Sequence, residues 1–326
     1  MTSDDKPVKL DNKDRRILLE LDTNAAQPLK QITRKLRMTK EAVSYRIKQL
    51  EERKIITNYI ALSHFAKLGL THYKLYIKYS HITSEKKKKI IDFILKEKNV
   101  GWLASTEGTY DLMVAIRYSS IFEFETFKDE LFSRFGDLFQ RNSFAILTEA
   151  ETYPRQYIFG TKNPMRKVFV FLDHSEKEDI DKEDMDIIKA LSKNSRASSI
   201  EIAKMTGLTD RIVRYRKKQL EKKGIIVGYK LAINYRLLNY LFFKCLIKFQ
   251  NFDKKRIRDL KLYARQHPNV IHWLKVIGEW DLELEIEAPS IDEFYSISND
   301  FREKFSDIIQ TFDAALVSEE HSITHA

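Results

Sequence analysis

Basic side chains recur at spacings of three and four residues in the second half of the chain. Arg211, Arg214 and Lys218 follow one another in this way, with Tyr215 beside them. Residues at these spacings share one face of an α-helix. Arg and Lys are also the donors that reach phosphate oxygens and base edges of DNA. The pattern therefore predicts a helix that binds a polyanion.

A weaker version of this face lies nearer the N-terminus, where the outward set contains the acid Glu41 and the base Lys48. We therefore expect the two faces to contribute unequally to binding. The candidate DNA-contacting residues are Thr39, Lys40, Ser44, Tyr45, Arg46 and Lys48 in the first stretch and Thr209, Arg211, Arg214, Tyr215, Arg216 and Lys218 in the second.

Each basic face belongs to the last of three expected helices. Residues 11–22, 29–36 and 39–54 form the first set, with Asp11 and Thr39 as N-caps. Residues 181–193, 199–206 and 209–223 form the second. Gly207 suits the turn of a helix-turn-helix, whereas Arg37 at the equivalent place does not. Residues 55–61 then read as a short hairpin with Asn58 at its turn, and Gly228 takes that place in the second set. These elements predict two winged helix-turn-helix domains.

The two sets are copies, because the chain repeats itself at a constant shift of 170 residues. Asp11 returns as Asp181, Tyr45-Arg46 as Tyr215-Arg216, and Gly108 as Gly278. A repeat of this length is a complete small protein rather than a solenoid unit. The formal net charge of +10 lies mainly in the front part of each copy: residues 1–65 carry +5 and residues 180–230 carry +6. A localised basic excess is typical of a polyanion binder.

The back part of each copy alternates strands and helices in the order βαββαβ, which predicts a ferredoxin-like domain. The expected fold class is α+β, with two winged helix-turn-helix domains alternating with two ferredoxin-like domains. Residues 156–160 and 166–172 look like the two strands of a hairpin, and residues 173–179 like a flexible joint. The expected boundaries are 8–65, 66–153, 154–179 for the hairpin and linker, 180–233 and 234–326.

The sequence lacks the residues that a disulfide, a metal site or a catalytic centre would need. The single cysteine, Cys245, permits no disulfide within the chain, and the eight histidines show no ligand spacing. No catalytic group, metal or cofactor is therefore expected. The N-terminal residues carry no secretion signal, and no stretch approaches the roughly 20 apolar residues of a membrane span. We expect a cytoplasmic protein that does not enter a membrane.

These motifs resemble the leucine-responsive regulatory protein/AsnC (feast/famine) family. The resemblance rests on Leu-Asp-x-x-Asp, Val-x-Tyr-Arg, Leu-Glu, Ile-Ile and Gly-x-Tyr-Asp in their order, twice in one chain. It implies a sequence-specific transcriptional regulator of double-stranded DNA whose second domain dimerises and binds a small effector such as an amino acid. Carried over, the effector candidates are Gly108, Asp111, Gly278 and Asp281.

The effector candidates have a plainer explanation, since glycine permits a β-turn and aspartate bonds its backbone. The turn after Trp102 is one residue longer than the turn after Trp273, so we expect two unequal effector sites. Two other functions stay open. Siroheme decarboxylases resemble the same architecture, although the first strand offers only His72, Tyr73 and Lys74 for such chemistry. A sensor without DNA binding would need acidic helix faces instead of basic ones.

The charges of the two expected sheets predict how they meet. In the second copy Glu283, Glu285 and Glu287 share a strand face. The first copy has the bases Lys74, Lys78 and Arg117 on the matching face, whereas Lys244 and Lys248 lie beside the glutamates. Like-charge contacts at an interface are costly, so we expect the unlike sheets to face each other and make one chain a pseudo-dimer. Higher homo-oligomers would use other surfaces.

Overall fold

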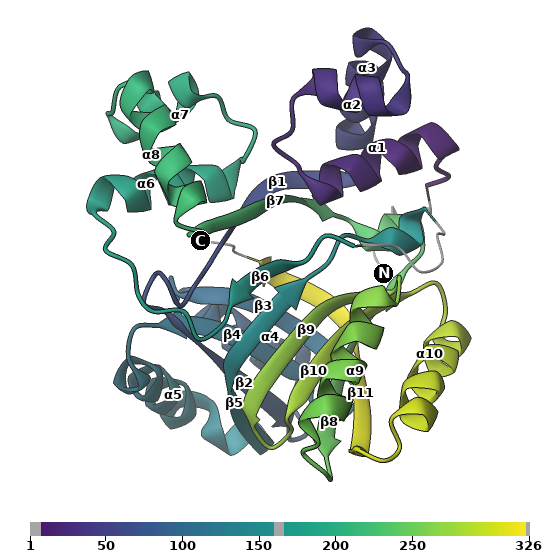
Figure 1. The fold of residues 1–326 in the computed structure, drawn as a ribbon. Coiled ribbons are helices and arrows are strands. Elements are labelled where there is room, and N and C mark those ends of the chain that lie inside the picture. The colour runs from purple at the N-terminus through teal and green to yellow at the C-terminus, as the bar shows by residue number, and fades with distance from the viewer. Residues whose placement is uncertain (1–7, 160–165, 324–326) are drawn as a thin grey trace.

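The computed structural model describes residues 8–159 and 166–323 and has mixed α and β content in two layers (Figure 1). The helices are α1 (Asn12–Thr23), α2 (Leu29–Leu36), α3 (Lys40–Glu52), α4 (Ser84–Ile94), α5 (Ile121–Phe135), α6 (Lys182–Lys193), α7 (Ser199–Thr206), α8 (Asp210–Lys222), α9 (Lys254–Gln266) and α10 (Ile291–Lys304). The strands are β1 (Ile56–Ser63), β2 (Thr71–Tyr79), β3 (Val100–Glu107), β4 (Leu112–Tyr118), β5 (Phe139–Thr152), β6 (Phe169–Leu172), β7 (Ile226–Ile233), β8 (Leu241–Phe249), β9 (Val270–Gly278), β10 (Leu282–Ala288) and β11 (Ile309–Ile323). No helix in these two ranges is long and apolar enough to cross a bilayer.

Two three-helix units, α1–α3 and α6–α8, form the upper layer (Figure 1). The Asp11 side chain accepts the backbone N–H of Asp14 and begins α1, and Asp181 caps α6 in the same way. The turn before the last helix needs a left-handed residue in both units. Gly207 supplies it with φ of 73°, and Arg37 adopts it with φ of 52°. The first unit thus tolerates a conformation that costs a non-glycine residue free energy.

The expected hairpin wings are absent from the described residues, and the prediction for residues 55–61 was wrong. β1 runs through Asn58 without turning and pairs antiparallel with β7 of the other copy, with Ile56 opposite Ile233 and Ser63 opposite Ile226. A lone strand must find a partner for its backbone groups, and the repeat supplies an equivalent one. Gly228 serves close packing here, since a Cβ at this position would lie 2.2 Å from the Phe169 ring. We call the β1–β7 pair the ribbon.

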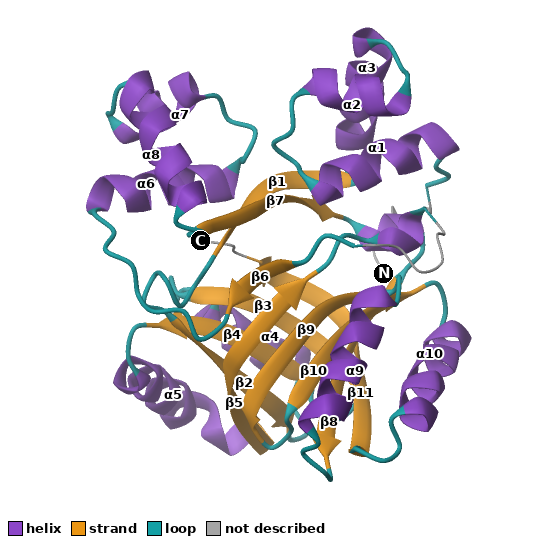
Figure 2. Ribbon diagram, in the orientation of Figure 1, coloured by secondary structure: helices purple, strands orange, loops and turns teal. Residues whose placement is uncertain are grey.

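The lower layer is a closed barrel made from the two βαββαβ units (Figure 2). Within each unit the third strand pairs with the first, as in β2–β4 and β8–β10. The units then join at two seams, β3 with β11 and β5 with β9. The eight strands follow one another as β2-β4-β3-β11-β8-β10-β9-β5 and return to β2. Closure leaves none of these strands with an unpaired edge.

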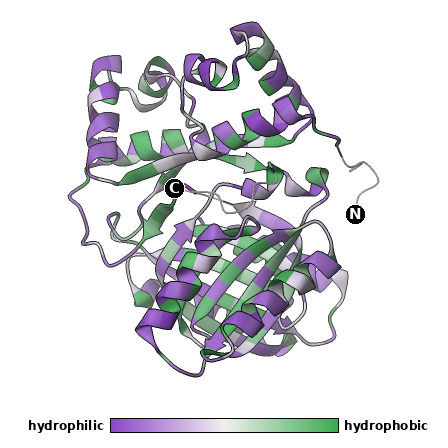
Figure 3. Cartoon of the chain, turned by 45° about the vertical axis from the view of Figure 1, so that its right-hand side comes forward, coloured by the Kyte–Doolittle hydropathy of each residue, from purple (hydrophilic) through white to green (hydrophobic). Residues whose placement is uncertain are grey.

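The four helices of the lower layer lie outside the barrel (Figures 1 and 2). Leu112, Val114 and Ile116 of β4 belong to the apolar core beneath α4 and α5, and Leu282, Leu284 and Ile286 of β10 belong to the equivalent core in the second unit. The alternate residues of both strands point into the barrel, as the sequence predicted. Figure 3 shows hydrophobic and hydrophilic residues alternating along the strands of the barrel.

The segment between the copies also differs from its prediction. Gln156–Ile158 form a 3₁₀ helix rather than a strand, and β6 pairs with the end of β5, with Leu172 opposite Ala150. The expected hairpin turn at residues 161–164 lies outside the described residues. The joint at 173–179 is held at both ends: His64 Nε2 lies 3.1 Å from Asp173, and the Glu178 N–H donates to the Lys67 carbonyl.

Candidate nucleic-acid interface and the cavity beneath it

The two helices that carry the basic faces, α3 and α8, stand at the end of the molecule opposite the barrel (Figure 1). Thr39 and Thr209 begin them by accepting the backbone N–H groups of Ala42 and Ile212. Tyr45 and Tyr215, at equivalent positions, are each 65% exposed. An exposed tyrosine beside basic residues is typical of an interface, because its ring is apolar and its hydroxyl is polar.

The two helix faces expose different numbers of cations, while their unequal contribution to DNA binding stays a prediction. Among the candidate residues on α8, the exposed cations are Arg211, Arg214 and Lys218, which we call the α8 basic set. On α3 the exposed cations are Lys40 and Lys48, which we call the α3 basic pair. The Lys48 ammonium lies 3.7 Å from Glu52, and Arg214 forms an ion pair with Asp210, so on each helix one of these cations has an acid beside it. Lys217 rests its ammonium 5.1 Å from the centre of the Tyr229 ring, consistent with a lysine whose stem lies along the core.

Two of the candidate arginines have an intramolecular task. The Arg46 guanidinium lies 2.7 Å from both Asp11 and Asp14. Arg216 makes the same bridge in the second copy, 2.8 Å from Asp181 and 2.9 Å from Asp184. Both arginines therefore fasten the last helix to the capped start of the first. The sequence motif Tyr-Arg supplied one exposed residue and one structural residue in each copy.

The effector candidates lie at the seams of the barrel. A Cβ on Gly108 would come 2.9 Å from the Ala314 carbonyl across the β3–β11 seam, and one on Gly278 would come 2.8 Å from the Phe144 carbonyl across the β5–β9 seam. The Asp111 carboxylate accepts the Tyr79 N–H and the Lys78 ammonium, both at 2.8 Å. Asp281 accepts the Phe249 N–H at 2.8 Å. These contacts give all four residues a part in sheet pairing.

The two tryptophans used to compare these turns are not equivalent. Trp102 pairs with Ala115 of β4, and the residue that occupies this place in the second copy is His272, opposite Glu285. Trp273 instead belongs to the helix-covered core. The shift of 170 residues therefore continues unbroken through this strand, and the inferred one-residue difference between the turns was wrong.

A chain of buried charges joins the two copies inside the barrel. The Glu283 carboxylate is fully buried and lies 2.5 Å from Lys74 of the first copy and 2.6 Å from Lys244 of its own. It also accepts a hydrogen bond from Tyr76. Lys244 pairs with Glu285 as well. The ammonium groups lower the pKa of Glu283 to about 2, although burial acts in the opposite direction.

The predicted facing of unlike charges is thus correct for Lys74 and Glu283, but not for every residue. Lys78 turns to Asp111 on its own sheet, and Lys248 lies 3.6 Å from Asp281. Glu287 is bound by Arg155, whose Nε lies 2.9 Å from it. The sheets also share hydrogen bonds at the seams, which the charge pattern did not indicate.

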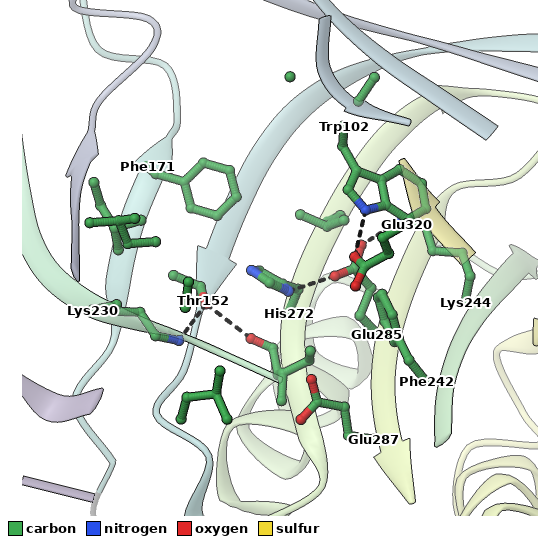
Figure 4. Close-up of a pocket in the computed structure, with 18 of the residues that line it drawn as sticks. Trp102, Thr152, Phe171, Lys230, Phe242, Lys244, His272, Glu285, Glu287 and Glu320 are labelled. Atoms are coloured by element: carbon green, nitrogen blue, oxygen red, sulfur yellow. Dashed lines mark hydrogen bonds and ion pairs between the residues drawn. The ribbon is translucent and has the colours of Figure 1, made fainter. Parts of the chain in front are cut away.

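A cavity of about 240 Å³ lies between the ribbon and the mouth of the barrel (Figure 4). Ile60, Leu62 and Lys230 of the ribbon form its roof. Its floor and walls combine aromatic and charged side chains of the barrel, of β6 and of the segment between β1 and β2: Phe65, His72, Lys74, Trp102, Phe171, Phe242, Lys244, His272, Glu285 and Glu320. Burial lowers the pKa of Lys230 to about 8, and the cations Arg155 and Arg166 act in the same direction.

Sequence reasoning missed this cavity and most of its charged residues. Lys230 was visible as the one charge in the segment Tyr229–Ile233, and the first copy has Ile60 at that position. Such a charge in an otherwise apolar strand is a signal for a buried partner. The partner groups, Thr152 Oγ1 at 3.0 Å and the Tyr153 carbonyl at 2.6 Å, lie at the end of β5, which no local pattern connects with β7.

Comparisons with known proteins give matches in both copies. Residues 10–51 match the AsnC-type helix-turn-helix domain, and residues 180–227 match a winged helix-turn-helix DNA-binding domain. The chain is 31% identical over 142 residues to the HTH-type transcriptional regulator LrpC of Bacillus subtilis (strain 168), which covers 43% of this chain and 93% of the relative. It is 30% identical over 135 residues to an uncharacterized HTH-type transcriptional regulator of Pyrococcus horikoshii, covering 41% of this chain and 90% of the relative. A relative of full length therefore corresponds to less than half of this chain.

A solved structure resembles nearly the whole chain. The siroheme decarboxylase NirDL superposes with a TM-score of 0.64 and covers 95% of this chain and 92% of its own, at 10% sequence identity. A likeness at this identity concerns the fold alone. The two-copy arrangement is thus a fold that another protein also adopts.

Proposed function

Since this chain belongs to the Lrp/AsnC family of DNA-binding transcriptional regulators, we propose that a single chain reads a two-part operator. Two helix-turn-helix domains (8–65 and 180–233), whose strands β1 and β7 pair with each other as the ribbon, alternate with two ferredoxin-like domains (66–153 and 234–326), joined by residues 154–179. The family relatives are regulators and not enzymes, and NirDL shares with this chain only its fold. A regulator of chromosomal DNA works in the cytoplasm.

The observation that carries this proposal is the ribbon. β1 follows α3 directly, β7 follows α8 directly, and the two strands pair antiparallel. An antiparallel pair of equivalent strands relates its two ends by an approximate two-fold axis, so α3 and α8 are presented as a symmetric dimer would present them. Dimeric helix-turn-helix proteins place their recognition helices in successive major grooves, with half-sites about 10 base pairs apart. One chain supplies both helices, so no second chain is needed for a complete site.

The contacts follow from the exposed residues. The α8 basic set with Tyr215, and the α3 basic pair with Ser44 and Tyr45, face DNA. Thr39 and Thr209 lie at the N-terminal ends of the helices, where a phosphate is also favoured by the backbone N–H groups. Because the α8 face carries three cations and the α3 face two, one half-site is held more tightly than the other.

The test is a binding selection on genomic fragments, followed by footprinting of the selected DNA with purified protein. We expect one chain per site and two protected half-sites of unequal strength on one face of the duplex. Neutralising Z phosphates gives a slope near −0.9Z in a plot of log affinity against log salt, so affinity must fall steeply with salt. A flat salt dependence, or a stoichiometry of two chains per two half-sites, contradicts the proposal.

A small effector, such as an amino acid, adjusts this DNA binding in our proposal. Support comes from the cavity, whose roof is the strand pair that carries the DNA-binding helices and whose floor is the barrel. Higher homo-oligomers would use the outer surface of the barrel layer. Measuring operator affinity with and without a mixture of amino acids tests the effector, and an unchanged affinity rejects it.

A further inference from the structure

Two charged side chains in the cavity beneath the ribbon form fewer hydrogen bonds and ion pairs than they could. Lys230 donates to Thr152 Oγ1 and the Tyr153 carbonyl, and its nearest carboxylate oxygen, on Asp22, is 4.0 Å away. An ammonium has three donors, so one N–H and much of its charge stay available. Lys230 is 4% exposed, and an unsatisfied charge at this depth is costly.

The second of these side chains is Glu320 on β11. Its carboxylate accepts the Trp102 indole N–H at 2.9 Å. Among the residues that the structure describes, no Lys, Arg or His side chain forms an ion pair with it. Burial, together with Glu285 and Glu287, raises the pKa of Glu320, although the hydrogen bonds with Trp102 and Tyr235 act in the opposite direction. A cation beside Glu320 would favour its charged form.

Two further polar atoms in the cavity wall lack a hydrogen-bond partner among the described residues, and a ligand could supply one. His72 Nε2 and Ser63 Oγ are buried, line the cavity and have no hydrogen-bond partner in the described ranges. Buried polar atoms in native structures nearly always have a partner. Between these groups the walls are apolar, with Phe65, Phe171 and Phe242. Apolar walls with a few convergent polar groups are typical of small-molecule sites.

The two charged side chains lie apart. Figure 4 shows Lys230 on one side of the cavity and Trp102 with Glu320 on the other, with His272 between them. A ligand that satisfies both must therefore carry a negative and a positive group at opposite ends. At roughly 30 Å³ for each water molecule, 240 Å³ corresponds to about eight waters, which suits a compact chain of about ten heavy atoms.

We propose that this cavity binds a small zwitterion with one carboxylate at one end and one ammonium at the other, of the ω-amino-acid class represented by 5-aminopentanoate and 6-aminohexanoate. The carboxylate pairs with Lys230 in the roof, the distal ammonium pairs with Glu320 in the barrel, and the methylene chain lies among the phenylalanines. This inference rests on the proposed regulatory function and assigns its effector to a site between the two layers.

The position of the site gives the ligand a means of control. Lys230 belongs to β7 of the ribbon, which leads directly from α8, whereas Glu320 belongs to the barrel. A ligand that bridges the two favours one placement of the ribbon on the barrel. Since the ribbon sets how α3 and α8 stand relative to each other, that preference changes operator affinity through differential binding to two states.

The test uses isothermal titration of the full-length protein with 5-aminopentanoate and 6-aminohexanoate. Hexanoate lacks the distal ammonium and cadaverine lacks the carboxylate, so both should bind at least tenfold more weakly. Lys230→Met and Glu320→Gln should each weaken the binding of 6-aminohexanoate at least tenfold. The matched controls Lys89→Met and Glu303→Gln, on the exposed surfaces of α4 and α10, should leave it unchanged. Circular dichroism and melting temperature identify any variant that fails to fold.

Three outcomes overturn the proposal: no binding of either ω-amino acid to the wild type, equal binding of hexanoate, or undiminished binding to either cavity variant when it is folded. Operator binding without ligand is measured for every variant in parallel. If it persists while binding of 6-aminohexanoate is absent, the effector site alone is refuted. If the wild type binds no DNA at any salt concentration, the proposed function itself is refuted.

Discussion

Replacing Glu283 with Gln tests how much the buried ion pairs between the two copies contribute to the stability of the fold. The carboxylate is fully buried and contacts Lys74 at 2.5 Å and Lys244 at 2.6 Å. Its pKa of about 2, against 4.5 for an ordinary glutamate, means that the folded state favours the ionised form by about 3 kcal/mol. Removing one partner of a buried pair typically costs about 3–5 kcal/mol, because the other charge is left unpaired.

The pH dependence follows from the sign of this pKa change. A depressed carboxyl pKa stabilises the folded state fully above pH 4.5, and that stabilisation is lost as the pH falls toward 2. We therefore expect Glu283→Gln to lower the free energy of unfolding by about 3 kcal/mol at pH 7. The difference in the free energy of unfolding between variant and wild type should narrow between pH 4.5 and pH 2.

Urea denaturation followed by tryptophan fluorescence measures both quantities. Trp280 donates its indole N–H to Glu283 at 3.2 Å and reports on this region directly. Glu303→Gln on the exposed surface of α10 is the control and should change stability by no more than about 0.5 kcal/mol. The double variant Glu283→Gln with Lys74→Met should be more stable than Glu283→Gln alone, since it removes one of the two buried ammonium groups that Glu283 no longer neutralises. A loss below about 1 kcal/mol at pH 7, or a gap that stays constant down to pH 2, refutes the reasoning.

Three other predictions concern the helix-turn-helix units. Changing the α8 basic set to Ala should weaken operator binding more than changing the α3 basic pair, and should reduce the salt slope by about 0.9 for each phosphate that the variant no longer neutralises; equal losses in fluorescence anisotropy would refute the assigned faces. Arg216→Gln should lower the melting temperature of the second unit and leave the salt slope unchanged, because this arginine binds Asp181 and Asp184; a reduced slope in a folded variant would show that Arg216 binds a phosphate instead. Gly207→Ala should lower the free energy of unfolding by about 1–2 kcal/mol, because alanine disfavours the left-handed backbone of this position. Among the described residues, no atom lies within 4 Å of the added methyl, so no steric clash contributes. Arg37→Gly should be stabilising for the same backbone reason, and thermal melts that show the opposite order contradict both predictions.

Local patterns in the sequence were sufficient to predict the helices and strands and which of their faces are buried. The caps at Asp11 and Thr39, the alternation of Leu282 with Glu283, and the constant shift between the copies each depend on residues close together in the chain or on direct comparison of two segments. They predicted the three-helix units, the βαββαβ order and the inequality of the two basic faces. The contact of Lys74 with Glu283 also followed, because like charges exclude the alternative pairing.

Only the tertiary structure decided which strands pair across the copies. A strand's periodicity shows which face is buried but not which partner completes its hydrogen bonds, so β1 was given a hairpin when its partner is β7, about 170 residues away. The same limit hid the two seams that close the barrel and misaligned Trp102 with Trp273. The cavity depends on all of these pairings at once, because its roof, walls and floor come from strands of both copies. A site built from non-local contacts has no signature in any one segment of the sequence.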